Sequence, residues 1–159
     1  MAKAPGLIER AQSNLFWVTS RLAMGCYRTF PLFGRLRASI AIIRDGSRVL
    51  MIRRNDGRGL CFPGGLAYPW ETDERALIRE VEEETGLHVT GCEFAFRYDS
   101  AGEIPVRIAV FQTQAEGELR RSWEGRPDWV ELAKARAGIL RSQEYVVERL
   151  VQGEDMGKS

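Results

Sequence analysis

The sequence predicts an α/β fold in which a mixed sheet lies between helical layers, with an additional helix at the N-terminus. Short apolar runs bounded by Gly, Asp and Asn recur along the chain and indicate strands. Between them, a segment that follows Thr72 has apolar residues at helical spacing, and a second helical pattern follows Ser142. Strands before and after one central helix, with another helix at the end, are typical of helices packed on a mixed sheet.

The first predicted element is a helix over residues 6–29. Apolar residues recur there at every third or fourth position, and Pro31 and Gly34 end the pattern. Residues 1–39 carry six bases and one acid, so this segment is strongly basic. We expect the helix to pack on its own domain. The alternatives are an arm that forms a homodimer and a contact with a membrane surface or nucleic acid.

The main domain is predicted to span residues 37–152, between the helical extension over residues 1–36 and a polar tail over residues 153–159. A chain of 159 residues is long enough for one such domain. Apolar runs at residues 39–43 and 49–52, joined through Asp45 and Gly46, predict a β-hairpin. Further strands are expected at residues 60–62, 89–98, 106–111 and 129–132, and the last helix is expected to start at Ser142.

The central helix has sequence signals at both ends. Thr72 can cap its first turn, where Asp73 and Glu74 interact favourably with the positive end of the helix dipole. Gly86 stands where a residue in the left-handed conformation usually ends a helix. These signals predict a helix from about residue 73 to residue 85.

This helix carries a cluster of acids. Residues 65–87 hold seven acids and two bases, although the whole chain has a net charge of +1. Glu80, Glu83 and Glu84 would share one helix face, where like charges cost roughly 0.2–0.5 kcal/mol per pair. A divalent cation would offset this repulsion, and oxygen ligands alone suit Mg²⁺ or Mn²⁺. The alternative, a solvated acidic face, does not account for the Gly-Gly turn that precedes the helix.

Residues 65–87 resemble the box of the Nudix (MutT-like) hydrolase family, G-x5-E-x7-R-E-U-x-E-E-x-G-U, in which U is apolar. Every specified position is filled, by Gly65, Glu71, Arg79, Glu80, Val81, Glu83, Glu84, Gly86 and Leu87. The preceding residues 62–64 are also similar to what the family shows. The resemblance implies a Nudix-type α/β/α sandwich. It further implies hydrolysis of the pyrophosphate bond of a nucleoside diphosphate linked to another moiety.

The resemblance also implies roles for individual residues. The groups expected to hold Mg²⁺ or Mn²⁺ are the carboxylates of Glu80, Glu83 and Glu84 and the backbone carbonyl of Gly64. Glu80 is alternatively the base that activates the attacking water. Arg79 is expected to orient these acids through its planar guanidinium, and Glu71 is expected to pair with Arg79.

Residues outside these positions are candidates for further roles. Arg54 and Arg58 are expected to meet substrate phosphates, although surface arginines often have no such function. Tyr68 and Trp70 are expected either to stack on a nucleobase or to pack in the core or in a lid. Glu124 lies in a segment that resembles the late loop of the family and is a candidate for an additional base. The alternative for Glu124 is a solvated loop acid.

The composition limits the classes of function. A net charge near zero argues against a dedicated nucleic-acid surface, and a single histidine cannot form a histidine-based triad or a zinc site. Three cysteines without metal or redox spacing, and no apolar run of 18 residues, favour a cytoplasmic protein without a transmembrane segment. The expected partner is a nucleotide-type small molecule. A non-catalytic nucleotide-binding or regulatory module on the same fold is the alternative to hydrolysis.

Overall fold

The computed structural model describes residues 36–100 and 106–153. The helix predicted over residues 6–29 and residues 154–159 of the predicted tail lie outside the described residues. The described elements are, in chain order, β1 (Leu36–Ile42), β2 (Arg44–Asp45), β3 (Arg48–Arg54), β4 (Leu60–Cys61), β5 (Gly64–Leu66), α2 (Asp73–Thr85), β6 (His88–Asp99), β7 (Val106–Glu116), β8 (Gly125–Glu131), α3 (Leu132–Ala135), η1 (Arg141–Gln143) and α4 (Glu144–Val151).

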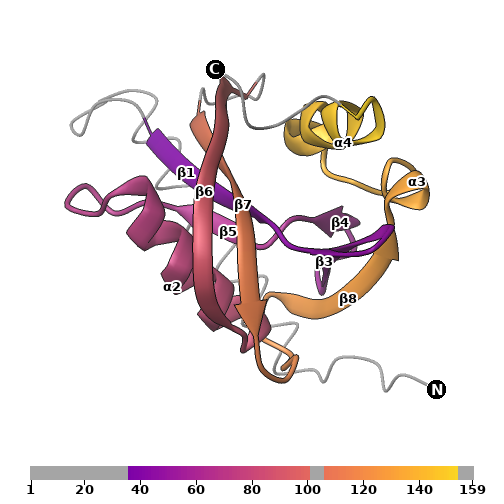
Figure 1. Ribbon diagram of the computed structural model, residues 1–159, viewed down its shortest axis with the longest axis horizontal. Helices are drawn as coiled ribbons and strands as arrows, with labels where there is room; N and C mark the ends of the chain where they lie inside the picture. Colours follow the sequence, from indigo (N-terminus) through magenta and orange to yellow (C-terminus); the bar gives the residue numbers. More distant parts are fainter. Residues whose placement is uncertain (1–35, 101–105, 154–159) are drawn as a thin grey trace.

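The strands form two sheets, one of which is mixed. In the first sheet, the strand order is β5-β1-β7-β6. Strand β1 is parallel to β7 and antiparallel to β5, and β6 is antiparallel to β7. In the second sheet, β3 pairs with β2, β4 and β8, always in the antiparallel sense. Figure 1 shows the curved strand β8 crossing below β3 and approaching the end of α2.

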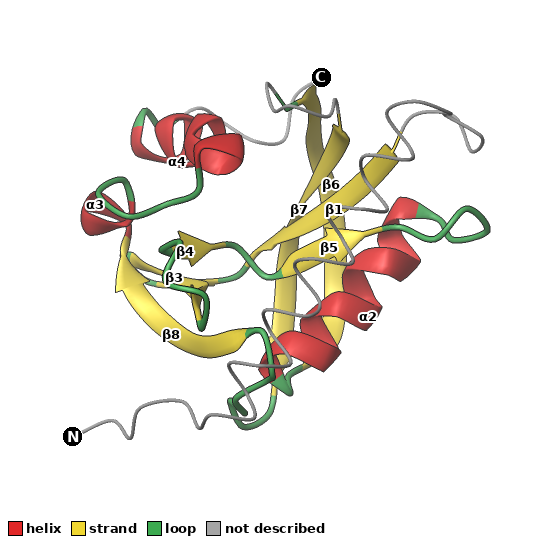
Figure 2. Cartoon of the chain, turned by 180° about the vertical axis from the view of Figure 1, so that it is seen from behind, coloured by secondary structure: helices red, strands yellow, loops and turns green. Residues whose placement is uncertain are grey.

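Helices cover both faces of the first sheet, and alternate residues of β1, together with Ile43 directly after it, belong to two separate cores. Ile40 and Ile42 belong to a cluster that includes α4 residues, whereas Ala41 and Ile43 belong to a cluster that includes residues of α2. Figure 2 shows α2 on one side and α3 with α4 on the other. This arrangement confirms the predicted α/β/α sandwich with a mixed sheet. No helix in the described ranges is long and apolar enough to cross a membrane.

Helix α2 begins and ends where the sequence predicts. The hydroxyl of Thr72 accepts a 3.2 Å hydrogen bond from the backbone N–H of Arg75, and Gly86 ends the helix with a φ of 75°. The hydroxyl of Ser39 donates to the backbone carbonyl of Asp73 over 2.7 Å. This hydrogen bond fixes the N-terminus of α2 to strand β1, so the acidic face of the helix has a defined position relative to the sheet.

Some strand predictions need correction. The turn at Asp45 and Gly46 is present, but it joins β2 to β3, whereas β1 pairs with β5 and β7. Strand β5 was not predicted, because three residues with two glycines lack the apolar alternation of a strand. Strand β8 begins at Gly125 and not at Trp129, since pairing with β3 extends through a polar stretch that has little strand propensity of its own.

Candidate functional site

A groove with a volume of ≈ 420 Å³ lies where α2, β5 and the segment before β8 meet. It is lined by Arg54, Gly64, Gly65, Leu66, Tyr68, Arg79, Glu80, Glu83, Glu84, Ser122, Trp123 and Glu124. Its volume lies in the range typical of sites for small molecules. The groove therefore brings together residues that are up to 70 positions apart in the sequence.

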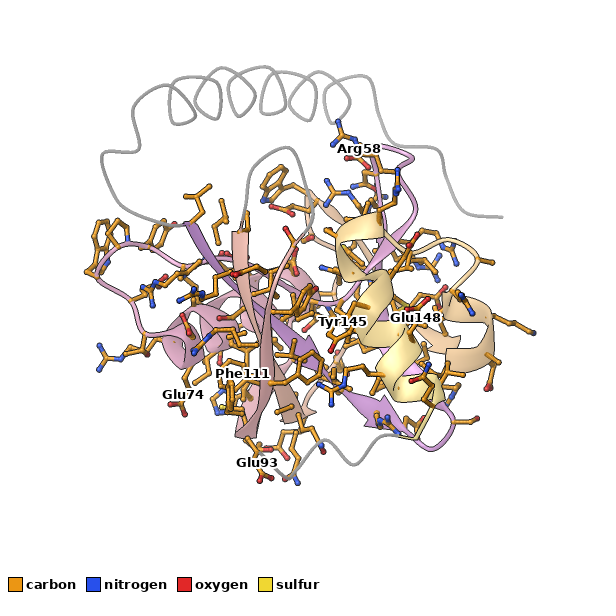
Figure 3. The ribbon with its side chains drawn as sticks, turned by 90° about the horizontal axis from the view of Figure 1, so that it is seen from above. Arg58, Glu74, Glu93, Phe111, Tyr145 and Glu148 are labelled. Carbon is orange, nitrogen blue, oxygen red and sulfur yellow. The ribbon has the colours of Figure 1, made fainter. Side chains whose placement is uncertain are left out.

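Most of the side chains that the sequence singles out line this groove. Glu80, Glu83, Glu84 and Arg79 come from α2, and the other predicted residues come from strands and loops around it. Arg58 is different, because it is not among the lining residues. Figure 3 shows Arg58 at the outer end of the loop between β3 and β4. Its Nε lies 3.7 Å from the carboxylate of Asp56.

Glu84 is the most deeply buried acid of the groove, with 4% of its surface exposed. Its Oε2 accepts a 2.8 Å hydrogen bond from the backbone N–H of Gly64. Burial raises the pKa of Glu84 well above its ordinary value, and the nearby carboxylates of Glu124 and Glu80 raise it further, against the opposing effect of the Gly64 N–H. Glu84 is therefore a carboxylate that is costly to keep ionised unless a cation faces it.

Glu80 lies against the backbone of Gly65. A Cβ atom added at Gly65 would come within 2.5 Å of the Glu80 carboxylate, so only glycine leaves room for this side chain. Burial raises the pKa of Glu80, and Glu124 and Glu83 add to the increase, whereas Arg79 lowers it. Gly65, the first residue of the box, has no side chain because the Glu80 carboxylate occupies the space that a Cβ would need.

Arg79 ties several groups of the site together. Its Nε and Nη2 donate to the two carboxylate oxygens of Glu71 over 2.9 and 3.0 Å, and its Nη1 donates to Glu80 over 2.7 Å. Nη2 also donates to the backbone carbonyl of Leu66 over 3.1 Å. The hydrogen bonds that Arg79 donates to Glu71 are the main reason why the pKa of Arg79 is raised. The predicted pairing of Arg79 with Glu71 is present, and Arg79 orients Glu80 as expected.

Glu83 is less enclosed than its neighbours on α2. Its side chain is 62% exposed, and its Oε2 lies 3.5 Å from Nη1 of Arg79. Helical spacing predicts one common face for Glu80, Glu83 and Glu84, and all three do line the groove. They differ in burial, however, because Glu84 faces the sheet and Glu83 faces the opening.

Arg54 lies in the groove with little freedom of its guanidinium. Nε and Nη2 of Arg54 donate to the carboxylate of Asp56 over distances of 2.7–3.2 Å. The side chains of Arg54 and Asp56 are 14% and 11% exposed. Hydrogen bonding from Arg54 is the main cause that lowers the pKa of Asp56, against the opposing effect of burial. Asp56, which the sequence analysis did not single out, thus holds a groove arginine in place.

The ring of Tyr68 is engaged within its own loop. It stacks on Trp70 with a centroid distance of 5.3 Å and an interplanar angle of 16°. The guanidinium carbon of Arg79 lies 4.5 Å from the centroid of the Tyr68 ring. These contacts engage the ring within its own loop, while Tyr68 also lines the groove.

Two hydrogen bonds from Asn55, which were not predicted from the sequence, position the segment before β8. The backbone N–H of Asn55 donates to the carbonyl of Glu124, and its Nδ2 donates to the carbonyl of Trp123, both over 2.9 Å. Ser122 and Gly125 close the segment through a 3.0 Å backbone hydrogen bond. A polar loop residue such as Asn55 has no local signal for a contact nearly 70 residues away, so only the fold reveals this role.

The donor set of the groove fits a hard divalent cation. In the described ranges, no three acidic, cysteine or histidine side chains are already placed closely enough to enclose a metal ion. The chemistry of the set nevertheless fits, because the groove lining holds the four carboxyl groups of Glu80, Glu83, Glu84 and Glu124 but only the two guanidinium groups of Arg54 and Arg79. Carboxylate oxygens are the ligands that Mg²⁺ and Mn²⁺ prefer.

Comparison with known proteins gives a family match and two relatives. The family model described as NUDIX domain matches residues 34–150. A Bacillus subtilis protein named "Putative 8-oxo-dGTP diphosphatase YtkD" is 40% identical over 67 residues, which cover 42% of each chain. A "MutT-like protein" of Streptomyces ambofaciens is 32% identical over 94 residues, covering 59% of this chain and 60% of that protein. This chain thus covers less than two thirds of the length of either relative.

Solved structures share the fold at low sequence identity. A MutT protein of Methanosarcina mazei superposes with a TM-score of 0.66 and 23% identity, covering 76% of this chain and 96% of the other. A MutT NUDIX hydrolase of Burkholderia pseudomallei gives a TM-score of 0.66 and 22% identity, covering 73% and 98%. These similarities establish the architecture of the domain.

Proposed function

The chain belongs to the NUDIX domain family, and on this premise we propose that it is a metal-dependent hydrolase of nucleotide pyrophosphate bonds. Its substrate would be a nucleoside diphosphate linked to another moiety, such as a further phosphate, a nucleotide or a sugar. The observation that carries the proposal is the groove in which the buried carboxylate of Glu84 faces Glu80 and Glu124 while Arg54 lies along the same wall. This chemistry needs cationic side chains that bind the phosphates and carboxylates that bind a metal ion.

The metal ligands in this proposal are the carboxylates of Glu80, Glu83 and Glu84, with the backbone carbonyl of Gly64. When bound there, Mg²⁺ or Mn²⁺ supplies neutralisation of phosphate charge and a lowered pKa of a coordinated water. Glu84 is held in position by the Gly64 N–H, and Glu80 by Arg79. Glu83 has the most exposed side chain of the three, and like the other two it lines the groove.

Water attacks phosphorus in the proposed reaction, and a carboxylate takes its proton. Glu80 and Glu124 are the two candidates for this base, because both carboxyl groups lie in the groove beside Glu84. Arg79 orients the acids and does not leave its ion pair with Glu71. Burial raises the pKa of Glu80, so its carboxylate takes up a proton more readily than an ordinary one does.

Substrate phosphates in this proposal meet Arg54. The fork of hydrogen bonds to Asp56 fixes the guanidinium, and a fixed guanidinium loses less entropy when it binds phosphate. Arg58 stands outside the groove lining and would contribute through long-range attraction only. Tyr68 would support the site by packing against Arg79.

The name of one relative indicates which substrates to test first. The Bacillus subtilis relative carries the name of an 8-oxo-dGTP diphosphatase, which acts on a nucleoside triphosphate. The first panel therefore contains nucleoside triphosphates, including 8-oxo-dGTP, together with ADP-ribose and dinucleoside polyphosphates. Release of phosphate or pyrophosphate is measured with Mg²⁺, with Mn²⁺ and with EDTA. Metal-dependent turnover of at least one compound is expected. Binding of nucleotides without any turnover would contradict the proposal and favour a non-catalytic nucleotide-binding module.

A further inference from the structure

The tip of the segment before β8 places a tryptophan in the lining of the groove. Ser122 and Gly125 close a two-residue loop, because the N–H of Ser122 donates to the carbonyl of Gly125 and the N–H of Gly125 donates to the Ser122 hydroxyl over 3.3 Å. Trp123 and Glu124 therefore form the tip of this loop, and both line the groove. The Trp123 side chain is 53% exposed, which is unusual for so large an apolar group.

The loop that carries Trp123 is held from outside. Asn55 binds the carbonyls of both tip residues, one through its backbone N–H and one through its side-chain amide. Nη2 of Arg121 lies 3.4 Å from Oδ1 of Asn55, which fixes the orientation of the amide. An exposed aromatic ring on an anchored backbone is pre-organised, so little entropy is lost when a planar ligand stacks on it.

We propose that Trp123 is the residue on which the nucleobase of the substrate stacks. The groove combines an indole ring with the fixed guanidinium of Arg54 and with the carboxylates that surround Glu84. A ligand that matches all three has a planar aromatic group at one end and metal-bound phosphates at the other, which describes a nucleotide. Tyr68 also lines the groove, and its ring contacts Trp70 and Arg79 within its own part of the site. The assignment rests on the proposed function and identifies a specificity-determining residue for it.

The chain offers a matched control for this assignment. Trp70 is also exposed, with 79% of its surface accessible, but it does not line the groove and stacks on Tyr68. Replacing Trp70 removes an indole of the same size from a position outside the groove lining. If the two variants Trp123→Ala and Trp70→Ala differ in ligand affinity, the difference arises from the position of Trp123 and not from the loss of an aromatic side chain in general.

The test measures binding of GMP and of ribose 5-phosphate to the full chain in Mg²⁺, by calorimetry. Ribose 5-phosphate carries the phosphate and sugar but no base. Trp123→Ala is expected to weaken GMP binding by roughly 5- to 150-fold, the range that stacking gives on alanine substitution, and to leave ribose 5-phosphate unchanged. Trp123→Phe is expected to retain most of the GMP affinity, and Trp70→Ala is expected to bind both ligands as the wild type does.

Three outcomes would overturn the assignment. They are unchanged GMP affinity in Trp123→Ala, equal weakening of both ligands in that variant, and an equal loss of GMP affinity in Trp70→Ala. Because the measurement concerns binding, it is independent of turnover. A wild-type protein that binds GMP through Trp123 but hydrolyses no nucleotide would refute the proposed reaction and leave the stacking role standing.

Discussion

The backbone N–H of Gly64 donates a 2.8 Å hydrogen bond to Oε2 of Glu84 and thereby fixes a carboxylate that is only 4% exposed. This bond links strand β5 to the C-terminal half of α2 across the groove. The hydrogen bond satisfies one acceptor position of the Glu84 carboxylate. It does not neutralise the charge, and the neighbouring groups Glu80 and Glu124 are also acidic. The protein is therefore expected to be destabilised at this point when no cation is bound.

The first prediction is that Glu84→Gln stabilises the metal-free protein. The amide has no charge to desolvate, and its oxygen can still accept from the Gly64 N–H. We expect a gain on the order of 1 kcal/mol, or roughly 2–4 °C in Tm, in a thermal scan with EDTA. Mg²⁺ should raise the Tm of the wild type, and this increment should disappear in the variant.

Glu82→Gln is the control for that comparison. Glu82 lies on the same helix, but its carboxylate contacts His88 over 2.8 Å and does not line the groove. Its removal should leave the Mg²⁺ increment intact. A Glu84→Gln protein that unfolds at a lower temperature in EDTA, yet still gains stability from Mg²⁺, would contradict the charge argument.

The second prediction concerns Glu83, the exposed acid of the groove. Because its side chain is 62% exposed, Glu83→Gln should change the free energy of unfolding by less than about 0.5 kcal/mol. If Glu83 is a metal ligand, kcat should fall by about 10²–10⁴, the usual effect of losing a catalytic group. Steady-state kinetics on a verified substrate give the answer, and near-normal turnover would remove Glu83 from the site.

The third prediction separates the role of Arg79 from chemistry. Arg79→Ala leaves Glu71 and Glu80 without their common partner, so both stability and activity should fall, with a loss of about 1–3 kcal/mol in denaturant unfolding. Arg75→Ala, at an exposed position of the same helix, should have little effect. The double variant with Glu71→Gln should lose less than the sum of the single changes, since the two residues form one ion pair. Strict additivity would argue against a structural coupling.

The fourth prediction tests the space around Glu80. In Gly65→Ala the new methyl group would displace the Glu80 carboxylate, so turnover should fall while the domain still folds. Gly91→Ala is the matched change, because a Cβ there has only an ordinary 3.6 Å contact with Gln114. Equal kinetics for the two variants would show that the position of Glu80 does not matter for the reaction.

The sequence predicted features that depend on neighbouring residues. The limits of α2 followed from Thr72 and Gly86, and the α/β/α architecture followed from the order of the elements. Helical spacing alone places Glu80, Glu83 and Glu84 on one side of α2, and the structure has all three lining one groove. The pairing of Arg79 with Glu71 was also expected, and the structure contains it.

Features that depend on distant pairing could not be predicted in this way. Strand β5 exists because β1 offers it a partner, and β8 begins early because β3 does. Asn55 and Asp56 position groove residues through hydrogen bonds that no local pattern encodes. Trp123 gave no sequence signal of its own, because an exposed tryptophan in a loop has no periodicity that would reveal which surface it faces.

The central claim is that the carboxylates around Glu84 form a metal-dependent catalytic site, and the dependence of turnover on Mg²⁺ concentration tests it most directly. The substrate is the most rapidly cleaved compound of the nucleotide panel, and the wild type is compared with Glu84→Gln and Glu82→Gln. We expect saturable activation by Mg²⁺ in the wild type and in Glu82→Gln, no turnover in EDTA, and a loss of at least about 10² in kcat for Glu84→Gln. Equal rates in EDTA and in Mg²⁺, or full activity of Glu84→Gln, would contradict the account.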